Sequence, residues 1–370
     1  MRAFVLVTAL LLGAAGAGAV GMRNLRPHSY YEAKFYDWLA KYDVKFDTGD
    51  EYARALQNFA DADDFISTHD AASAGFTMAH NAYSHLSWSE FRQLKGIGRP
   101  LQSSPNHPIF PANPAADAAA VADAAALEAE VAAATAARRR SLRAGGDDAA
   151  EGDDEPTLEA VDWSGKGGVT PVKNQGGCGS CWSFSATGAL EGAYFVKYGK
   201  LESFSEQELV DCDTYDSGCN GGLMDYSFHW IQKNGGLCRE DDYPYTGDGS
   251  EACRKRSCDV VSGSAVASWV DVPSNMNALM QAVARQPVAV AIEADEMSFQ
   301  FYSGGVLTAS CGTSLDHGVL LVGYGETDDG TKYWKVKNSW GADWGDHGFI
   351  KLERGAPQQG GECGILMQVS

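Results

Sequence analysis

Apolar residues recur at helical spacing in the first hundred residues of the chain. In the stretch from Tyr30 to Tyr42, aromatic side chains fall every three or four positions, which predicts a helix with one apolar face. These side chains are Tyr31, Phe35 and Trp38. A second helix is expected from Glu51 to Asp70, with Leu56, Phe59 and Ile66 on its apolar side. Outside these stripes the region is polar, and it contains no cysteine.

From about Thr157 the sequence becomes aromatic, cysteine-rich and globular. Its first half predicts a helix from Cys181 to Tyr198, capped by Ser180 and ended by Gly199, and a short helix opened by a capping box at 205–208. A third helix candidate covers residues 223–233. The second half predicts strands, which are residues 288–292, 319–322, 333–337 and 349–352. Helices followed by strands indicate an α+β body of two lobes.

A low-complexity stretch separates these two regions. Residues 112–156 are rich in alanine, aspartate, glutamate and glycine, and such a segment cannot bury enough apolar area to offset its ordering entropy. We interpret it as an exposed linker between a front part (residues 20–111) and a back part (residues 157–370). Residues 1–19 predict a secretory signal peptide, with an apolar stretch from Ala3 to Leu12 followed by small residues. That stretch is too short to span a bilayer comfortably, so a membrane anchor is the weaker interpretation.

Charge and cysteine content narrow the function classes. The 370 residues carry a net charge of −20, with 29 basic against 49 acidic residues, which argues against nucleic acid as a partner because phosphate binding needs clustered Lys and Arg. The nine cysteines all lie in the second half of the chain. A signal peptide implies an oxidising compartment in which disulfides persist. Nine is odd, so at least one thiol is left over.

The densest chemical signal places Cys178 and Cys181 three positions apart at the start of the predicted helix. A helix N-terminus carries partial positive charge, which stabilises a thiolate and lowers its pKa. Cys181 is therefore the better candidate nucleophile. A thiolate nucleophile needs an adjacent imidazole. Among eight histidines, His317 enters an apolar strand in Leu315-Asp316-His317-Gly318, although elimination alone gives it only modest support.

A family resemblance makes this assignment specific. The string Cys178-Gly179-Ser180-Cys181-Trp182 resembles the signature around the nucleophile of papain and the cathepsins. His317 and the string Asn338-Ser339-Trp340-Gly341 follow at about the distances of that family, and the resemblance covers nearly all of residues 160–370. It implies a papain-like fold of the cathepsin L-like subgroup: a helical left lobe, a β-barrel-like right lobe and an active-site cleft between them. It also implies a cysteine endopeptidase made as an inactive precursor.

The same resemblance implies a role for each matching residue. Cys181 attacks the scissile carbonyl, and His317 forms a thiolate–imidazolium pair with it and then protonates the leaving amine. Asn338 orients the imidazole, as the third member of a catalytic triad does. Gln175, together with the backbone N–H of Cys181, resembles an oxyanion hole. Trp340 is expected to shield the contact between Asn338 and His317 from water.

Substrate contacts are implied in the same way. The residues expected to meet the substrate are Gly221, Gly222, Leu223, Met224, Ala291, Leu315, Asp316, Gly318, Trp340 and Gln368. The pocket for the second residue before the cut (P2) is mostly apolar, so we expect Phe or Leu there, although Gln368 is less apolar than the family pattern suggests. No long insertion lies between Cys219 and Cys253, which favours endopeptidase over carboxydipeptidase activity.

The family pattern also pairs the other cysteines. It implies the disulfides Cys178–Cys219, Cys212–Cys253 and Cys311–Cys363. Cys238 and Cys258 remain, and we expect a fourth bridge between them. Free structural thiols at 238 and 258 are the alternative. With four bridges, Cys181 is the thiol left over.

The front part resembles the inhibitory propeptide of this family. The residues that match its helix signature are Glu51, Arg54, Phe59 and Ile66, while Ala62 and Asp70 replace the usual asparagines. Asn81 and Tyr83 fit the short motif that follows, and His85 stands where aspartate is common. His85, and also His80, are candidates for a pH-sensitive release, against the equally weighted interpretation that both are surface residues. Processing is expected between about residues 138 and 158, because exposed linkers are nicked first.

Two other function classes remain as alternatives. A disulfide oxidoreductase using Cys178 and Cys181 would leave His317, Asn338 and Gln175 without a role. A catalytically silent binding protein of the same fold would not need a competent residue at every catalytic position. A zinc site lacks a second Cys/His pair, so we expect neither metal nor cofactor. The expected partners are polypeptide substrates and the protein's own propeptide, with no nucleic acid, no membrane span after signal removal and a monomeric state. The expected location is the secretory pathway, ending in a lysosome or vacuole or outside the cell.

Overall fold

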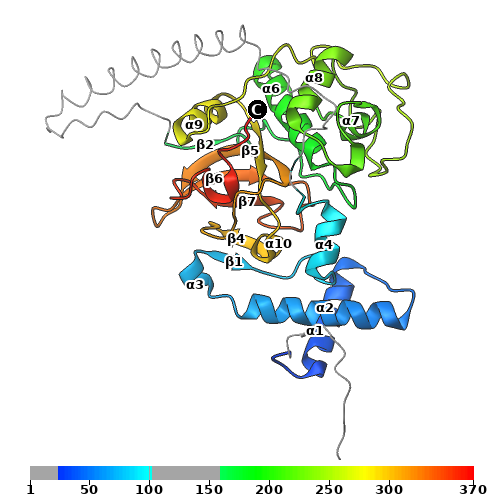
Figure 1. Cartoon of the computed structure of the whole chain (residues 1–370), viewed down its shortest axis with the longest axis vertical. Helices are drawn as coiled ribbons and strands as arrows, with labels where there is room; N and C mark the ends of the chain where they lie inside the picture. Colours follow the sequence, from blue (N-terminus) through cyan, green and yellow to red (C-terminus); the bar gives the residue numbers. More distant parts are fainter. Residues whose placement is uncertain (1–23, 100, 102–158) are drawn as a thin grey trace, which may run out of the picture.

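The computed structural model describes residues 24–99, 101 and 159–370, and Figure 1 shows the front part lying along one side of the back part. The expected signal peptide at 1–19 and linker at 112–156 lie outside the described residues. In the described part of the chain, no helix is both long and apolar enough to cross a membrane.

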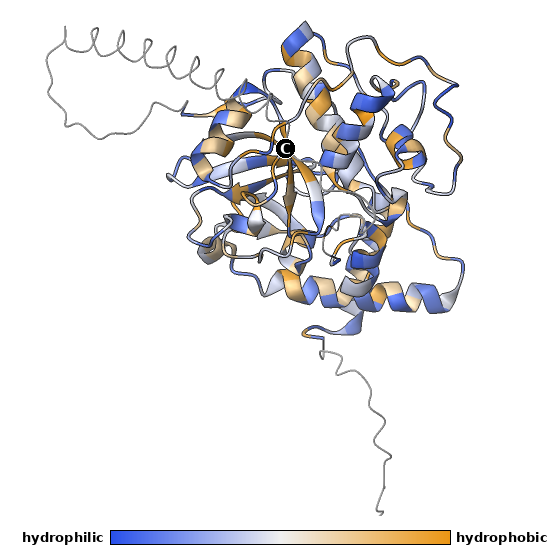
Figure 2. Cartoon of the chain, turned by 45° about the horizontal axis from the view of Figure 1, so that its top comes forward, coloured by the Kyte–Doolittle hydropathy of each residue, from blue (hydrophilic) through white to orange (hydrophobic). Residues whose placement is uncertain are grey.

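The front part is built on two helices that pack against each other. Its elements are α1 (His28–Tyr42), α2 (Gly49–Ser67), α3 (Ala71–Ala74), β1 (Phe76–Met78) and α4 (Trp88–Lys95). Thr48 opens α2 with a reciprocal capping box, in which its hydroxyl accepts from the N–H of Glu51 and the Glu51 carboxylate accepts from the N–H of Thr48. The predicted apolar faces of α1 and α2 meet where the Phe35 ring lies 5.3 Å from the Phe59 ring. Figure 2 shows the matching alternation of hydrophobic and polar residues along α2.

The front part attaches to the back part through backbone groups. Strand β1 pairs antiparallel with β4 (Tyr302–Gly305), so that the two parts share a two-stranded sheet. Just beyond β1, the side-chain amide of Asn81 donates to the carbonyl of Gln300 at 2.7 Å. The Asn81 carbonyl in turn accepts from the indole of Trp38 at 2.8 Å, which ties the aromatic cluster to this junction.

The helical lobe of the back part surrounds one buried helix. Its elements are α6 (Cys181–Tyr198), α7 (Glu206–Cys212), the 3-10 turn η1 (Gly218–Asn220) and α8 (Met224–Asn234). All twelve residues from Cys181 to Gly192 are buried, so this part of α6 is enclosed on every side, whereas residues 196–198 at its end are exposed. The helix ends at Gly199, whose φ of 66° is a left-handed conformation that glycine adopts without strain.

The second lobe is an antiparallel sheet. Its strands are β2 (Val161–Asp162), β3 (Val288–Ile292), β5 (His317–Glu326), β6 (Lys332–Lys337) and β7 (Phe349–Glu353). They follow the order β2-β5-β6-β7, with β3 also paired to β5, and no pairing among the described strands closes this sheet into a barrel. The remaining elements are α9 (Met276–Arg285), α10 (Met297–Phe301) and the 3-10 turn η2 (Glu362–Gly364). Strand β5 packs against α6, so the two lobes meet along these elements.

Four disulfides cross-link the back part. They are Cys178–Cys219, Cys212–Cys253, Cys238–Cys258 and Cys311–Cys363, the pairs expected from the sequence. The predicted cap of α6 differs: Ser180 occupies the N-cap position, but its side chain does not cap the helix. The Ser180 hydroxyl instead hydrogen-bonds the Tyr245 hydroxyl at 2.7 Å, because a tertiary partner lies within reach.

Candidate active site

Cys181 is the first residue of α6, and its thiol is free. The side chain is buried, and the backbone N–H of Gly318 donates a hydrogen bond to it. Burial raises the pKa of the Cys181 thiol to about 11, and the Gly318 N–H opposes this shift only in part. In this occluded state the thiol therefore keeps its proton at neutral pH.

His317 is the first residue of β5 and is fully buried. Its Nε2 atom pairs with Oδ1 of Asn338 at 2.8 Å, and the Trp340 ring lies 4.9 Å from the imidazole. The other nitrogen, Nδ1, is buried and has no hydrogen-bond partner among the described residues. Burial lowers the pKa of His317 to about 4, against the Asn338 hydrogen bond and with a contribution from the charge of Lys95.

Gly318 connects these two groups. It directly follows His317, and its N–H bonds the Cys181 side chain, so the starts of β5 and α6 meet at the candidate site. A Cβ at Gly318 would lie 3.2 Å from the Cα of Trp182, which shows how closely the two elements approach. The arrangement leaves Nδ1 of His317 without a partner among the described residues, next in sequence to the N–H that binds the free thiol.

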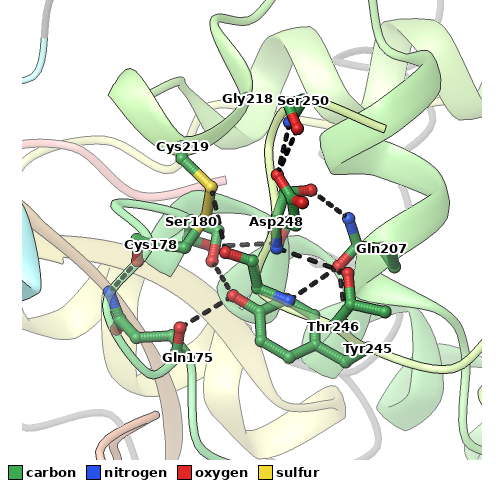
Figure 3. The surroundings of a disulfide bond; sticks show 12 residues. Gln175, Cys178, Ser180, Gln207, Gly218, Cys219, Tyr245, Thr246, Asp248 and Ser250 are labelled. Carbon is green, nitrogen blue, oxygen red and sulfur yellow. Dashed lines mark hydrogen bonds between the residues drawn. A yellow bond between two sulfur atoms is a disulfide. The ribbon is translucent and has the colours of Figure 1, made fainter. Parts of the chain in front are cut away.

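Gln175 lies beside the same helix start. Its Nε2 donates to the carbonyl of Cys178 at 2.9 Å and to the carbonyl of Lys95 at 3.3 Å. Its Oε1 accepts from the Ser339 hydroxyl at 2.7 Å, which fixes the orientation of the amide. Figure 3 shows the Tyr245 hydroxyl between the backbone carbonyl of Gln175 and the side chain of Ser180, bracing the loop next to the Cys178–Cys219 bridge.

Comparison with known proteins identifies the family. Residues 157–370 match the family described as papain family cysteine protease, and residues 35–91 match the cathepsin propeptide inhibitor domain (I29). The chain belongs to the papain family of cysteine proteases. It is a cysteine protease precursor that carries its own propeptide inhibitor domain.

Relatives and solved structures agree with this membership. The chain is 58% identical to thiol protease SEN102 of Hemerocallis sp. over 57% of this chain and 58% of that protein. It is 38% identical to the senescence-specific cysteine protease SAG39 of Oryza sativa subsp. japonica over 96% of this chain and 94% of that protein. Among solved structures, the proform of the ragweed pollen cysteine protease Amb a 11 superposes with a TM-score of 0.72 at 32% identity, covering 94% of this chain and 96% of that one.

The front part of this protease precursor reaches the cleft through residues that follow the matched inhibitor domain. Residues 92, 93, 96–99 and 101 line the same cavity as Cys181 and Gly179. The N–H of Gly98 donates to Oδ2 of Asp316 at 2.7 Å, and the N–H of Leu101 donates to the carbonyl of Leu315 at 2.9 Å. Together with the Lys95 carbonyl at Gln175, these contacts place backbone of the front part along the cleft.

The expected substrate-contacting residues separate into two sets. Gly221, Gly222 and Asp316 line the cleft with Cys181. Met224, Ala291 and Gly318 lie together behind them: Ala291 is opposite Gly318 in the sheet, and the Met224 sulfur would be 3.3 Å from a Cβ at Gly318. Gln368 reaches this set through its carbonyl, which accepts from the N–H of Ala291. Leu223, Leu315 and Trp340 are also not among the cleft-lining residues while the front part is docked.

Some residues at the site carried no sequence signal. Lys95 is fully buried at the end of α4, with its Nζ donating to the Tyr83 hydroxyl and to the carbonyl of Gly176. Ser339, which orients Gln175, lies in the Asn338–Gly341 string, but the resemblance implies no role for it. Asp316 was expected only as a substrate contact, yet it binds the N–H of Gly98, and burial raises its pKa to about 7.

Proposed function

We propose that Cys181 is the nucleophile of this protease, that His317 is its acid–base partner, and that Asn338 and Gln175 complete the catalytic set. One observation carries the proposal: Nε2 of His317 is held by Asn338, while its Nδ1 is left without a partner at the start of the strand that contacts Cys181. Trp340, with 1% of its surface exposed, supports this set by covering the imidazole.

The chemistry follows from these positions. The proton of the Cys181 thiol moves to His317, and the thiolate attacks the scissile carbonyl carbon. Nε2 of Gln175 and the N–H of Cys181 stabilise the oxyanion. The C–N bond then breaks as His317 donates its proton to the leaving amine. His317 next takes a proton from water as the water oxygen attacks the thioester carbon. The C–S bond then breaks, His317 returns its proton to the sulfur, and the carboxylic acid is released with the thiol restored.

The front part supplies the inhibition in this scheme. The Gln175 amide is engaged by the Lys95 carbonyl, so the oxyanion donor is occupied before any substrate arrives. We assign residues 20–111 to the propeptide and 157–370 to the mature enzyme, with processing within 138–158. Four disulfides support passage through an oxidising compartment, and we assign the signal peptide to residues 1–19 on that basis. A vacuole, a lysosome and the extracellular space all fit, and we assign a monomeric state.

The P2 pocket is assigned to the apolar set behind the cleft wall. Met224 and Ala291 are fully buried there, and both present apolar surface, so we expect Phe or Leu at P2. A series of fluorogenic peptides tests this assignment. Faster cleavage of dibasic substrates than of Phe-Arg substrates would assign the pocket elsewhere.

Labelling of the activated enzyme tests the catalytic set. An epoxide inhibitor of papain-like enzymes is expected to modify one thiol per molecule, and peptide mapping should locate the label on Cys181. A Cys181→Ser variant is the matched control and should stay unlabelled and inactive. A label on Cys178, or retained activity in Cys181→Ser, would refute the assignment.

A further inference from the structure

The loop from Asp213 to Leu223 forms one wall of the cleft and contains two carboxyl groups. Tyr215, Asp216 and Ser217 line the cavity beside Gly221 and Gly222. The loop folds back on itself, since the N–H of Ser217 donates to the carbonyl of Gly221 at 3.0 Å. Gly221 and Gly222 are the residues along which we expect an extended substrate to bind through its backbone.

The two carboxyl groups of this loop contact each other. Oδ1 of Asp213 accepts from the N–H of Tyr215 at 2.8 Å, and Oδ1 of Asp216 accepts from the N–H of Leu223 at 2.8 Å. Oδ2 of Asp213 is buried and receives no N–H or O–H donor from any described residue. The carboxyl groups of Asp213 and Asp216 interact, and the backbone N–H of Asp216 also binds the Asp213 carboxyl. Two carboxyl oxygens hydrogen-bond only if one of them carries a proton.

The surroundings offer no basic partner that would let both groups ionise. In the described part of the chain, neither carboxyl forms an ion pair with a lysine, arginine or histidine. On α8, Oδ2 of Asp216 meets only the Ser227 hydroxyl, at 3.5 Å, and His229 contacts the ring of Tyr215.

The other nearby acids have partners of their own. On α7, Asp211 bonds Gln207 and the Tyr243 hydroxyl. Asp225 of α8 pairs with Ser370. Burial raises the pKa of Asp213 to about 6, and burial followed by the charge of Asp213 raises the pKa of Asp216 well above its ordinary value.

We propose that Asp213 and Asp216 share one proton and act as positioning residues. Together they hold Gly221 and Gly222 against the substrate backbone, an inference that rests on the proposed function. The carboxyl of Asp216 binds the N–H that directly follows Gly222. It also lies so close to Gly222 that a Cβ there would be 2.6 Å from Oδ1. A shift of this carboxyl therefore moves the wall that the substrate contacts.

The expected pH dependence has a definite sign. Because the pKa of Asp213 is raised to about 6 and that of Asp216 well above its ordinary value, the pair still holds a proton at pH 6 and loses it as the pH rises further. Two adjacent negative charges then repel each other in a poorly solvated site, which displaces the Asp216 carboxylate together with the N–H of Leu223 that it holds. The consequence is weaker substrate binding at the alkaline end, seen in KM rather than in kcat.

Steady-state kinetics of the activated enzyme test this pairing between pH 5 and 9. For a peptide substrate that extends three residues before the cut, KM of the natural enzyme should rise at least fivefold between pH 6 and 9, with a smaller change in kcat. Asp216→Asn should keep KM flat, because its amide donates to the Asp213 carboxylate at every pH while its oxygen still accepts from Leu223. Asp216→Ala should have a high KM throughout. Asp329→Asn, in an exposed turn, is the control and should follow the natural profile.

Alkylation by iodoacetamide separates this proposal from the assignment of the nucleophile. The reagent is small and does not occupy the Gly221–Gly222 wall, so its rate at Cys181 should be equal in the natural enzyme and Asp216→Asn. An unreactive Cys181 in both would refute the catalytic assignment instead. A KM profile of Asp216→Asn that matches the natural enzyme, or a KM as high as that of Asp216→Ala, would overturn the shared-proton pair.

Discussion

Replacing Lys95 by methionine should tighten the docking of the front part. The Lys95 amine is fully buried, it donates to the Tyr83 hydroxyl at 2.9 Å and to the Gly176 carbonyl at 3.2 Å, and among the described residues no carboxylate pairs with it. Burial lowers its pKa from 10.5 to about 7. At about 1.4 kcal/mol for each pH unit, this difference corresponds to a cost of about 5 kcal/mol for docking the front part at neutral pH.

The sign of the linkage defines the pH window. The pKa of Lys95 is lower in the docked state than in the free state, so docking weakens as the pH falls from about 10 to 7 and changes no further below 7. Methionine removes this cost but also removes two hydrogen bonds worth about 1 kcal/mol each. Tyr83 keeps its bond to the Trp340 carbonyl, and Gly176 is exposed to water, so neither group is stranded. The net gain is about 2–3 kcal/mol.

Limited proteolysis of the full-length precursor measures this difference. With Cys181→Ala in the background to prevent self-cleavage, Lys95→Met should lose the front part to an added protease at least tenfold more slowly at pH 7, because cleavage follows the population of the open state. The Lys95 protein should gain protection as the pH is raised from 7 to 9.5. Lys45→Met removes an exposed lysine of the same part and is the control. Faster loss of the front part in Lys95→Met at pH 7 would show that the buried charge stabilises docking and would refute this reasoning.

Three further substitutions test other contacts. Gln175→Ala should lower kcat/KM by about 10²–10³, as followed with a fluorogenic peptide, while iodoacetamide still modifies Cys181; an unchanged kcat/KM would exclude an oxyanion role. Cys238 and Cys258 are 20 positions apart. Replacing both by serine should lower the unfolding free energy by about 3 kcal/mol and the Tm by several degrees. An unaltered Tm would contradict this. Asp295→Asn breaks a partly exposed ion pair with Arg92 (2.8 Å), which is worth at most about 1 kcal/mol. In the same limited proteolysis, the front part should therefore be lost up to about fivefold faster. Added salt should accelerate this loss only in the natural sequence.

The parts of the fold with local signals were predictable. The helix from Cys181 to Tyr198 has the predicted bounds, because Gly199 ends it by a local backbone preference. Strand β3 likewise covers the predicted 288–292, since a short apolar run of β-branched residues and alanines leaves little choice. The predicted bounds of β5 were too short at both ends, because pairing with β3 adds His317 and Gly318, and pairing with β6 extends the strand from Gly323 to Glu326.

Features that depend on docking between distant segments were not predictable. Ser180 precedes a helix and has the composition of a cap, yet its hydroxyl bonds Tyr245, a residue far along the chain. From the sequence, Lys95 is a cation near the C-terminus of a helix, where it favours the helix dipole and is usually exposed to solvent. Asp213 and Asp216 read as loop acids, and only the fold of the loop brings their carboxyl groups into contact.

The two pKa shifts at the candidate catalytic pair explain how one docking event can block the site and lower its reactivity. Burial raises the pKa of Cys181 to about 11 and lowers that of His317 to about 4, so the thiol and the imidazole are both neutral at any pH between these values. A neutral thiol is a poor nucleophile, because the reactive species is the thiolate. The charged amine of Lys95, which belongs to the front part, further disfavours a charged imidazole. We expect removal of the front part to give both groups more contact with water, which would move their pKa values toward each other and favour the charged pair. Inhibition and the neutral state of the thiol and the imidazole therefore have the same physical cause. That cause is the exclusion of water from the start of α6 and of β5.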